Sequence, residues 1–256
     1  RLIVTEHPSV GLRFLVDTGL AQHFFPELPA MSLEQDPIHR HKDVLTHTFA
    51  VVENVQENAS ENFDFRLTRL AALFHDIGKP KTRSIKDGKG VTFHHHEVVG
   101  ARMSRERLRA LRYPTQEVEA ITELVALHLR FHTYQMGWTD SAVRRYVRDA
   151  GDYLNELNVL TRCDCTTRNE KKAMMLAKRM DDLETRIIEL TSQEELAALR
   201  PELDGAAVME QLGLPPGRMV GAALNFLMEI RLEEGLLGEV EARRRLGEWW
   251  LTQPKA

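Results

Sequence analysis

The spacing of apolar residues constrains the fold of this chain more than any other feature. Apolar residues recur at intervals of three and four, whereas strand-like alternation over several residues is nearly absent. Such intervals place apolar side chains on one face of an α-helix. Helices are predicted over 8–19, 43–58, 66–75, 96–111, 115–128, 141–150, 152–166 and 170–190. The prediction is an all-α fold, a helical bundle followed by a smaller helical tail.

Glycine and proline mark the expected connections between these helices. Three connecting stretches are predicted at 26–37, 79–93 and 212–218. The second is expected to be a loop with a short hairpin around Asp87-Gly88. Ser192 and Glu195 have the spacing of a capping box, which predicts that a new short helix begins there.

Composition excludes several classes of protein. With 43% hydrophobic residues the chain can bury an ordinary core, and a net charge of -4 argues against a uniformly basic nucleic-acid binder. No apolar run approaches the roughly 18 to 20 residues of a membrane span, and no secretory signal is present. We therefore expect no membrane association and a cytoplasmic location. Cys163 and Cys165 make a poor disulfide pair and are expected to be reduced thiols.

Two local features leave alternatives open. Between 102 and 112 there are five arginines and one glutamate, which indicates either a solvated helix face or a phosphate-binding patch. The chain starts at Arg1 rather than methionine, and Leu2-Ile3-Val4 follows without a loop. We therefore expect the chain to begin inside a longer protein.

Histidines and carboxylates stand on or beside apolar helical faces. His75-Asp76 ends the apolar run 70–74. His47 has valines at offsets of -3, +4 and +8, and His128 follows apolar residues at -7, -4 and -3. An inward histidine needs a polar partner, which is either backbone, as in many protein cores, or a metal ion.

Asp164 lies at the end of a face formed by Leu154, Leu157 and Leu160. A buried ionised carboxylate is costly without a partner. A metal ion would supply that partner, and so would a buried arginine such as Arg162 or Arg168.

The run His94, His95 and His96 can contribute only one or two side chains to a common centre. His96 is chosen because Val99 and Met103 continue its face at +3 and +7. His39, His41 and His132 are expected to lie on the surface or to contact the metal ligands without binding the metal themselves.

These residues together predict a metal centre with the ligands His47, His75, Asp76, His96, His128 and Asp164. Mixed imidazole and carboxylate donors suit nickel, manganese, iron, cobalt or zinc. One bridging carboxylate would allow two ions about 3.5 to 4 Å apart, an arrangement that favours phosphoester hydrolysis. Asp76 and Lys79 are the predicted catalytic residues. Lys79 and Arg130 are candidates for neutralising a substrate phosphate, and each is alternatively an ordinary exposed cation.

The ligand pattern resembles the HD superfamily, whose pattern is a histidine, a His-Asp pair and a distal aspartate. His47, His75-Asp76 and Asp164 match that set, and His96 and His128 match the additional histidines of members that bind two metals. Ile77-Gly78 is typical of the HDIG subgroup.

The flanking segments are similar to the HD-containing body of bacterial tRNA nucleotidyltransferases, related to poly(A) polymerases. The matching stretches are Pro26-Glu27-Leu28, His41 to Thr48, His75 to Pro80 with Thr82-Arg83, Leu203-Asp204-Gly205 and Leu214 to Gly221. The last two look nearest to the actinobacterial branch.

The resemblance implies tRNA 3′-end CCA addition by the intact protein, with tRNA as partner. The family's nucleotidyltransferase head carries a Gly-Ser and paired aspartates, and nothing here matches them. Its ATP, CTP and magnesium sites are therefore expected upstream of Arg1. Members with intact HD sites are similar to enzymes acting on 2′,3′-cyclic and 2′-phosphates. Arg83, Arg130 and Arg218 are the predicted phosphate or RNA contacts.

The expected domains are helices preceding the HD domain over 1–35, the HD phosphohydrolase over 36–168 and an RNA-binding helical tail over 169–256. The turn at 213–217 opens a helix whose N–H groups could accept an RNA phosphate, or it is simply a tight turn. Two other functions stay open: a non-catalytic module that positions tRNA, and a free-standing HDIG hydrolase of nucleotides.

Overall fold

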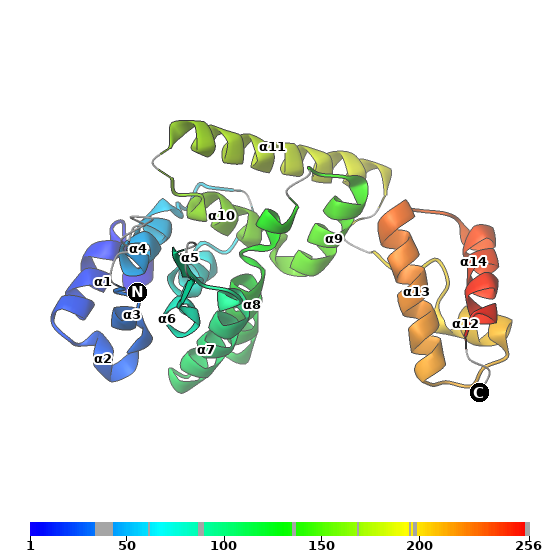
Figure 1. Ribbon diagram of the computed structural model, residues 1–256, viewed down its shortest axis with the longest axis horizontal. Helices are drawn as coiled ribbons and strands as arrows, with labels where there is room; N and C mark the ends of the chain where they lie inside the picture. The colour runs from blue at the N-terminus through cyan, green and yellow to red at the C-terminus, as the bar shows by residue number, and fades with distance from the viewer. Residues whose placement is uncertain are drawn as a thin grey trace. The chain divides into compact units, whose positions relative to one another are not determined.

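The structure is a computed structural model that describes residues 1–33, 43–60, 62–86, 90–134, 137–167, 169–194, 196 and 199–253. Helices dominate this part of the chain, which confirms the predicted all-α fold (Figure 1). The described residues form two compact units, Arg1–Gln135 with Asp152–Met180, and Met136–Gly151 with Asp181–Ala256. The three-part division at residues 35 and 168 stays a prediction.

The first unit opens with short helices: η1 (Leu2–Val4), α1 (Pro8–Asp17), α2 (Ala21–Phe24) and α3 (Glu27–Ala30). The expected connector at 26–37 was therefore wrong in its first part, because Pro26 and Pro29 are compatible with a short helix. Residues 34–42, including Pro37, His39 and His41, lie outside the described residues. Arg69 ties this region to the bundle, because its buried guanidinium donates to the Ile3 carbonyl oxygen at 3.0 Å.

The bundle that follows is built around α5 (Phe65–Phe74), in which every residue from Leu67 to Phe74 is buried. It packs against α4 (Val44–Asn54), α8 (Thr115–Leu127) and α10 (Leu154–Asp164), and α7 (His96–Ala110) lies along α8. The helix starts follow from the sequence. The Asp43 side chain accepts a hydrogen bond from the Thr46 N–H, and Asp64 accepts one from Leu67.

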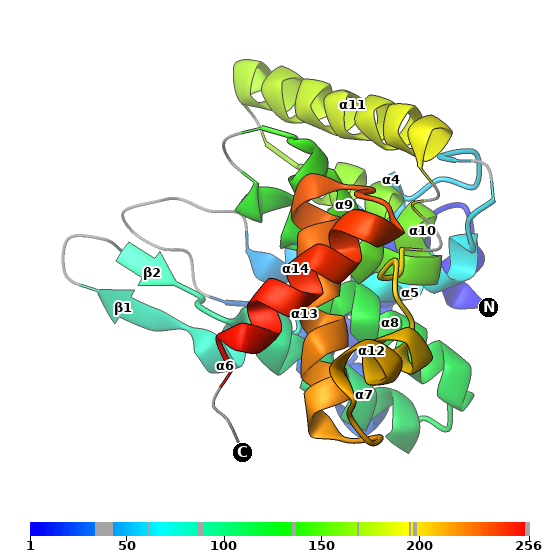
Figure 2. The same ribbon diagram turned by 90° about the vertical axis from the view of Figure 1, so that its right-hand side faces the viewer.

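The predicted loop at 79–93 contains regular structure. Lys79–Thr82 forms α6, whose early proline fits because the first turn of a helix needs no N–H from it. Strands β1 (Ser84–Lys86) and β2 (Gly90–Thr92) then pair antiparallel, with Ile85 opposite Val91 (Figure 2). The expected hairpin is present in these strands, while its turn at 87–89 lies outside the described residues.

The second unit holds α9 (Asp140–Ala150), the last part of α11 (Glu170–Gln193), α12 (Gly205–Leu212), α13 (Arg218–Glu234) and α14 (Glu239–Leu251). The stretch 212–218 separates α12 from α13, as predicted. Buried residues of α12, α13 and α14, among them Val208, Leu227 and Leu246, form one apolar core.

The capping box predicted at Ser192 was wrong. Ser192 belongs to the last turn of α11, and its hydroxyl donates to the Glu189 carbonyl oxygen at 2.6 Å. A serine that bonds backward to its own helix cannot cap the next one. Glu195, the other half of the expected motif, is not among the described residues.

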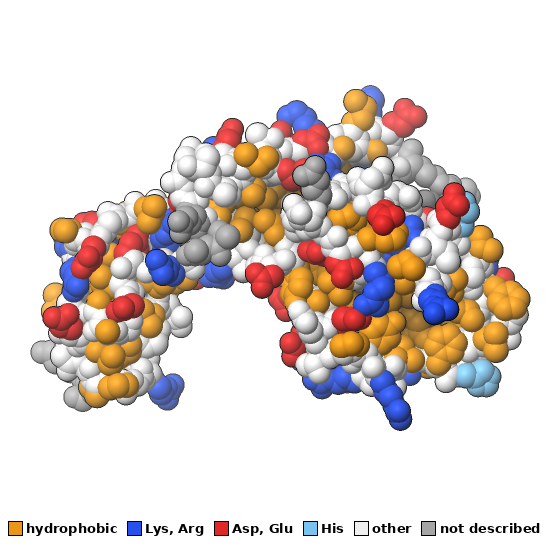
Figure 3. All heavy atoms as spheres, turned by 180° about the vertical axis from the view of Figure 1, so that it is seen from behind, with side chains coloured by type: hydrophobic (Ala, Val, Ile, Leu, Met, Phe, Trp, Pro, Cys, Tyr) orange, Lys and Arg blue, Asp and Glu red, His pale blue; other side chains and the backbone are white. Residues whose placement is uncertain are grey.

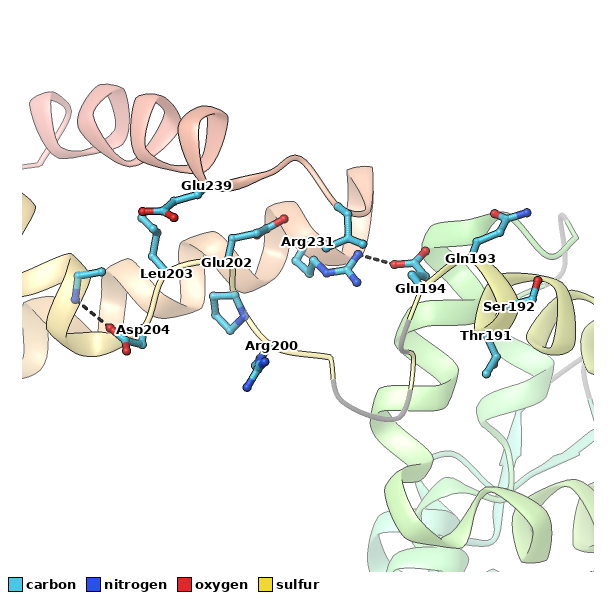
Figure 4. A pocket seen from close by; sticks show the side chains of 13 residues that line it. Thr191, Ser192, Gln193, Glu194, Arg200, Glu202, Leu203, Asp204, Arg231 and Glu239 are labelled. Carbon is cyan, nitrogen blue, oxygen red and sulfur yellow. Dashed lines mark hydrogen bonds and ion pairs between the residues drawn. The ribbon is translucent and has the colours of Figure 1, made fainter.

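A buried ion network joins three helices of the second unit. Glu194 at the end of α11 accepts hydrogen bonds from Arg144 of α9 at 2.8 Å and from Arg231 of α13. All three side chains are less than a tenth exposed. A cavity of about 900 Å³ lies beside Arg231 and Glu194, and Figure 4 shows their side chains meeting at its edge.

Apolar surface is also exposed on the N-terminal helices. Val10, Phe14, Leu20 and Phe24 are all at least 40% exposed, and Figure 3 shows hydrophobic side chains grouped over this part of the first unit. No helix among the described residues combines the length and apolar character that a membrane span requires.

Candidate metal centre

The six predicted ligands come from five segments of the first unit. His47 lies within α4, His75 and Asp76 follow the last residue of α5, and His96 is the first residue of α7. His128 follows the last residue of α8, and Asp164 is the last residue of α10. Four of the five segments thus contribute ligands at helix ends, where the apolar faces of the bundle converge.

His47, His75 and Asp164 form one triad with ligand atoms within 4.8 Å of one another. The Asp164 Oδ1 atom lies 2.9 Å from His47 Nε2 and 3.4 Å from His75 Nε2. The two Nε2 atoms are 3.3 Å apart. This grouping is open on one side, since His47 and Asp164 are partly exposed while His75 is fully buried.

Asp76, His96 and His128 form a second triad, and all three are buried. The His96 Nε2 atom lies 3.2 Å from Asp76 Oδ1 and 3.2 Å from His128 Nε2. His128 Nε2 is 3.9 Å from the same carboxylate oxygen.

Asp76 joins the two triads through its two oxygens. Its Oδ2 atom faces the first triad, at 3.2 Å from His75 Nε2 and 3.5 Å from His47 Nε2. Its Oδ1 atom faces the second triad. Asp76 is thus placed to bridge two ions, one on each side of the carboxylate.

The ring orientation of the histidines leaves Nε2 as the ligating atom. Three of them direct Nδ1 at the carbonyl oxygen three residues earlier: His75 at Ala72 (2.7 Å), His96 at Phe93 (2.8 Å) and His128 at Val125 (2.7 Å). A carbonyl only accepts, so each Nδ1 carries the proton and the neutral ring keeps its lone pair on Nε2. His47 Nδ1 instead meets the Thr166 hydroxyl at 2.9 Å.

These orientations test whether the residues fit a metal ion. In the second triad, the lone pairs of His96 Nε2 and His128 Nε2 point toward one another and toward Asp76 Oδ1. That oxygen is buried and has no hydrogen-bond partner among the described residues. Acceptors converging without a donor repel unless a cation lies between them. The donor set therefore fits a divalent ion, and its mixed nitrogen and oxygen atoms suit a transition metal.

The charges within the centre are also consistent with a site for a cation. Burial raises the pKa values of Asp76 and Asp164. The charge of His75 and hydrogen bonds from the neighbouring histidines, joined at Asp76 by the charge of Lys79, together outweigh burial and hold both pKa values well below their usual range. Burial disfavours a charged His75, but Asp76 and Asp164 raise its pKa to about 10. For His128, burial and the charge of His75 lower the pKa to about 3. In the absence of an ion, the proton on His75 compensates the carboxylates.

The neighbouring histidines differ from the ligands in exposure. His94 and His95 are exposed, whereas His96 is buried. His132 is half-buried, and its pKa is lowered by burial and by the charges of Arg179 and Lys172. His39 and His41 lie outside the described residues.

The predicted cations are distributed unevenly. Lys79 Nζ lies 2.6 Å from Asp76 Oδ2, directly at the carboxylate that faces both triads. Arg130 is part of η2 (Arg130–Thr133), two residues after His128, and its guanidinium lies over the Tyr134 ring at 5.4 Å. Arg83 is exposed after α6, and Arg218 is exposed at the start of α13 in the second unit. Lys79 thus directly contacts a predicted ligand.

The structure bears on two alternatives that the sequence left open: an arginine partner for Asp164 and a phosphate-binding patch at 102–112. Asp164 is paired with His47 and His75, and Arg168, one of its predicted arginine partners, is not among the described residues. In the arginine-rich stretch of α7, Arg107 pairs with Glu27 at 2.9 Å, while Arg102 and Arg105 are exposed.

Sequence reasoning missed a pocket of about 490 Å³ beside the first triad. Its walls include Asp164, Thr166, Lys172, Arg179 and His132. A signal was present, because Lys172 and Arg179 are seven residues apart and therefore share a face of one helix. However, two cations on a long polar helix are equally typical of a solvated face, so the sequence alone did not indicate a pocket.

Comparison with known proteins agrees with this geometry. The HD domain model matches residues 44–191. The CC-adding tRNA nucleotidyltransferase of Thermus thermophilus is 33% identical over 98% of this chain and 55% of its own length. The A-adding tRNA nucleotidyltransferase of Deinococcus radiodurans is 32% identical over 97% of the chain and 56% of its own length.

A multifunctional CCA protein of Mannheimia succiniciproducens is 28% identical over half of the chain and 30% of its own length. The chain thus spans about half the length of the two relatives that match nearly all of it. The family model covers more than half of the chain and includes all six predicted ligands. The chain belongs to the HD domain family.

Proposed function

We propose that the first unit is a metal-dependent phosphohydrolase whose centre holds two divalent transition ions. The observation that carries this proposal is Asp76, which offers one oxygen to each of two triads of potential ligands. Ions bound there would supply a water of lowered pKa and positive charge for the phosphoryl oxygens. The ligands in this proposal are His47, His75, Asp76, His96, His128 and Asp164.

Lys79 has the second role in the proposed site. Its ammonium group contacts Asp76 Oδ2 at 2.6 Å and lies 5.7 Å from the centre of the Phe93 ring. A cation held at the bridging carboxylate is positioned to attract a substrate phosphate and to stabilise negative charge that develops on it. Arg130 and Arg83 are proposed as more distant phosphate contacts.

The proposed substrates are 2′,3′-cyclic and 2′-phosphates of nucleotides, as the family resemblance implies. We expect the chain to hydrolyse 2′,3′-cyclic AMP in the presence of nickel or manganese, and Asp76→Ala to abolish the reaction. His95→Ala is the matched control, because this exposed histidine adjoins a ligand without being one. Hydrolysis that survives in Asp76→Ala would contradict the proposal.

For the intact protein we propose a tRNA nucleotidyltransferase that adds CCA or part of it to tRNA. Support comes from the two relatives that are similar over nearly all of this chain. ATP, CTP and magnesium would bind in a nucleotidyltransferase head of the same polypeptide. The helices of the second unit would contact tRNA, with Arg218 at the start of α13 facing a phosphate.

Binding of labelled tRNA measured by fluorescence anisotropy tests this second proposal. We expect salt-dependent binding that Arg218→Ala weakens. A chain that binds tRNA but holds no transition metal and hydrolyses nothing would instead be a tRNA-positioning module, a function that the same relatives also favour. Turnover of free nucleotides without any tRNA affinity would identify a free-standing hydrolase.

A further inference from the structure

The pocket beside the first triad has the size of a small-ligand site. Its volume is about 490 Å³, within the range typical of pockets that bind small molecules. It lies in the first unit, between the end of α10, the segment 165–167 and the first three turns of α11. His132 of η2 contributes a further wall.

The pocket adjoins the candidate metal centre. Asp164 belongs to both, since it lines the pocket and its Oδ1 atom lies 2.9 Å from His47 Nε2. Thr166 also lines the pocket, and its hydroxyl meets His47 Nδ1 at 2.9 Å. A molecule in the pocket can therefore contact Asp164 of the first triad and Thr166, the hydrogen-bond partner of His47.

Two cations of α11 give the pocket its charge. Lys172 and Arg179 line it from one helix face, with Leu176 between them, and Asp164 is the one carboxylate among the lining residues. Lys171 and Lys178 precede them by one position each and do not line the pocket. An ion on Asp164 would make the whole cavity positive, so the pocket selects an anionic ligand.

Arg179 is held in place by residues that adjoin the pocket. Its guanidinium donates to the Tyr134 carbonyl oxygen at 2.9 Å and stacks over the buried Phe131 ring at 4.8 Å. A fixed guanidinium loses little freedom when it binds a phosphate, and its planar fork suits phosphate oxygens.

The reacting phosphate does not account for these cations. In the proposed reaction it is neutralised at the metal centre and by Lys79, which lies at the bridging carboxylate. Lys172 and Arg179 are additional, and they line a cavity that shares Asp164 with the first triad. We propose that this pocket binds a second phosphate group of the substrate, so that the preferred substrate is a nucleotide phosphoester that carries another phosphate.

This inference rests on the proposed phosphohydrolase function and narrows its substrate class. The second phosphate has two chemical sources, a 5′-phosphate on a free nucleotide or the last phosphodiester of an oligoribonucleotide. Both place a phosphate on the 5′-oxygen of the terminal nucleoside. The test therefore uses three substrates: 2′,3′-cyclic AMP, its 5′-phosphorylated form, and diadenosine ending in a 2′,3′-cyclic phosphate.

Steady-state kinetics of the manganese-loaded chain gives the first readout. We expect at least one of the two diphosphorylated substrates to have a higher kcat/KM than 2′,3′-cyclic AMP, and the better of the two identifies the source. Lys172→Gln and Arg179→Lys should each lower that kcat/KM by about tenfold or more, as expected when a charge-assisted hydrogen bond is lost. The value for 2′,3′-cyclic AMP should be unchanged.

Lys178→Gln is the matched control, because it removes one charge from the same helix outside the pocket. Bound manganese and the melting temperature should be the same in all variants. The inference is overturned if no diphosphorylated substrate is preferred, or if the pocket variants lower turnover of all three substrates equally.

A binding measurement separates this inference from the proposed hydrolysis. Calorimetry with adenosine 3′,5′-bisphosphate and adenosine 3′-monophosphate needs no turnover. If the chain hydrolyses nothing, the proposed activity fails, and the calorimetry alone decides about the pocket. Tighter binding of the bisphosphate that Lys172→Gln abolishes would support the pocket, and equal binding of both nucleotides would refute it.

Discussion

At the scale of single residues, the centre depends on neighbours that differ sharply in environment. His96 is buried with its Nε2 atom 3.2 Å from Asp76 Oδ1, whereas the adjacent His95 is exposed. His95 also adopts a left-handed backbone conformation with φ of 60°, which lets the chain turn into α7. Substitutions at these two positions therefore test the two-triad arrangement directly.

We expect His96→Gln to lower the number of bound manganese ions from two to one. The variant removes a ligand of the second triad and leaves His47, His75 and Asp164 intact. Elemental analysis of the purified chain after manganese loading and desalting measures the number. His95→Gln should keep both ions, and a His96→Gln chain that also keeps both would contradict the assignment of the second triad.

Gly78 has a steric role next to the centre. A Cβ atom there would lie 2.3 Å from the His96 carbonyl oxygen and 2.7 Å from the Gly100 nitrogen. Both atoms belong to the backbone of α7, so relief requires a backbone shift rather than a new rotamer.

We therefore expect Gly78→Ala to destabilise the chain by about 1–3 kcal/mol, the usual cost of overpacking. Urea denaturation measures the change in the free energy of unfolding. Gly221→Ala in α13 is the control, since a Cβ there meets nothing within 4 Å. That control should be neutral or slightly stabilising, and an equal loss in both variants would refute the steric explanation.

At the scale of elements, the buried network of Arg144, Glu194 and Arg231 fixes α9, the end of α11 and α13 to one another. Gly235 follows α13 with φ of +84°, and a Cβ there would lie 2.7 Å from an Arg144 side-chain nitrogen. The arrangement is thus specified both by charge and by a glycine that leaves room for the guanidinium.

Glu194→Gln should lower the free energy of unfolding by about 3–5 kcal/mol, because it leaves two buried guanidinium groups without their carboxylate. Glu248→Gln is the control, since its ion pair with Arg244 on α14 is exposed and exposed pairs contribute at most about 1 kcal/mol. Chemical denaturation of both variants checks the difference. A small loss for Glu194→Gln would mean that solvent reaches the network.

The sequence predicted elements best where periodicity was strong. The predicted starts of the helices at 8, 96 and 115 agree with α1, α7 and α8. It failed for the short helices α2, α3 and α6, because four residues are too few to show a period, and α3 and α6 also contain a proline. It failed at Ser192, because the local signal of a capping box could not reveal that α11 continues.

In the candidate site too, features with a sequence pattern could be predicted and features without one could not. The six converging residues could be selected because each adjoins an apolar face, and His96 could be chosen over its neighbours by that criterion alone. The division into two triads could not be predicted, because it depends on which carboxylate oxygen points to which helix. Lys172 and Arg179 lie on a later, polar-faced helix of the sequence, and only the folded chain connects them with Asp164.

At the scale of the whole molecule, the unusual charges of the centre predict how stability depends on pH. The folded-state pKa of His75 is raised to about 10, so its contribution is complete below about 6.5, the unfolded value, and is lost as pH rises toward 10. The folded-state pKa of His128 is lowered to about 3, so stability is lost as pH falls below 6.5. The lowered carboxylate pKa values add a further loss in acid.

We expect the metal-free chain to have its highest melting temperature near neutral pH and to lose stability on both sides. Calorimetry in the presence of a chelator at several pH values measures this. A bound ion replaces the proton on His75, so the loss at high pH should be reduced in the manganese-loaded chain. Identical alkaline losses with and without manganese would contradict the predicted coupling.

The order of segments in the second unit has a consequence for synthesis of the chain. Its α9 is made early, yet the residues of α13 that cover it begin only at Arg218. At roughly 5 to 20 residues per second, the ribosome needs several seconds to make the intervening segment. During that time α9, which carries the apolar side chains Val143, Tyr146 and Val147 that are buried in the finished fold, lacks its neighbour α13. Nascent chains stalled between α9 and α13 should therefore be the form most dependent on chaperones.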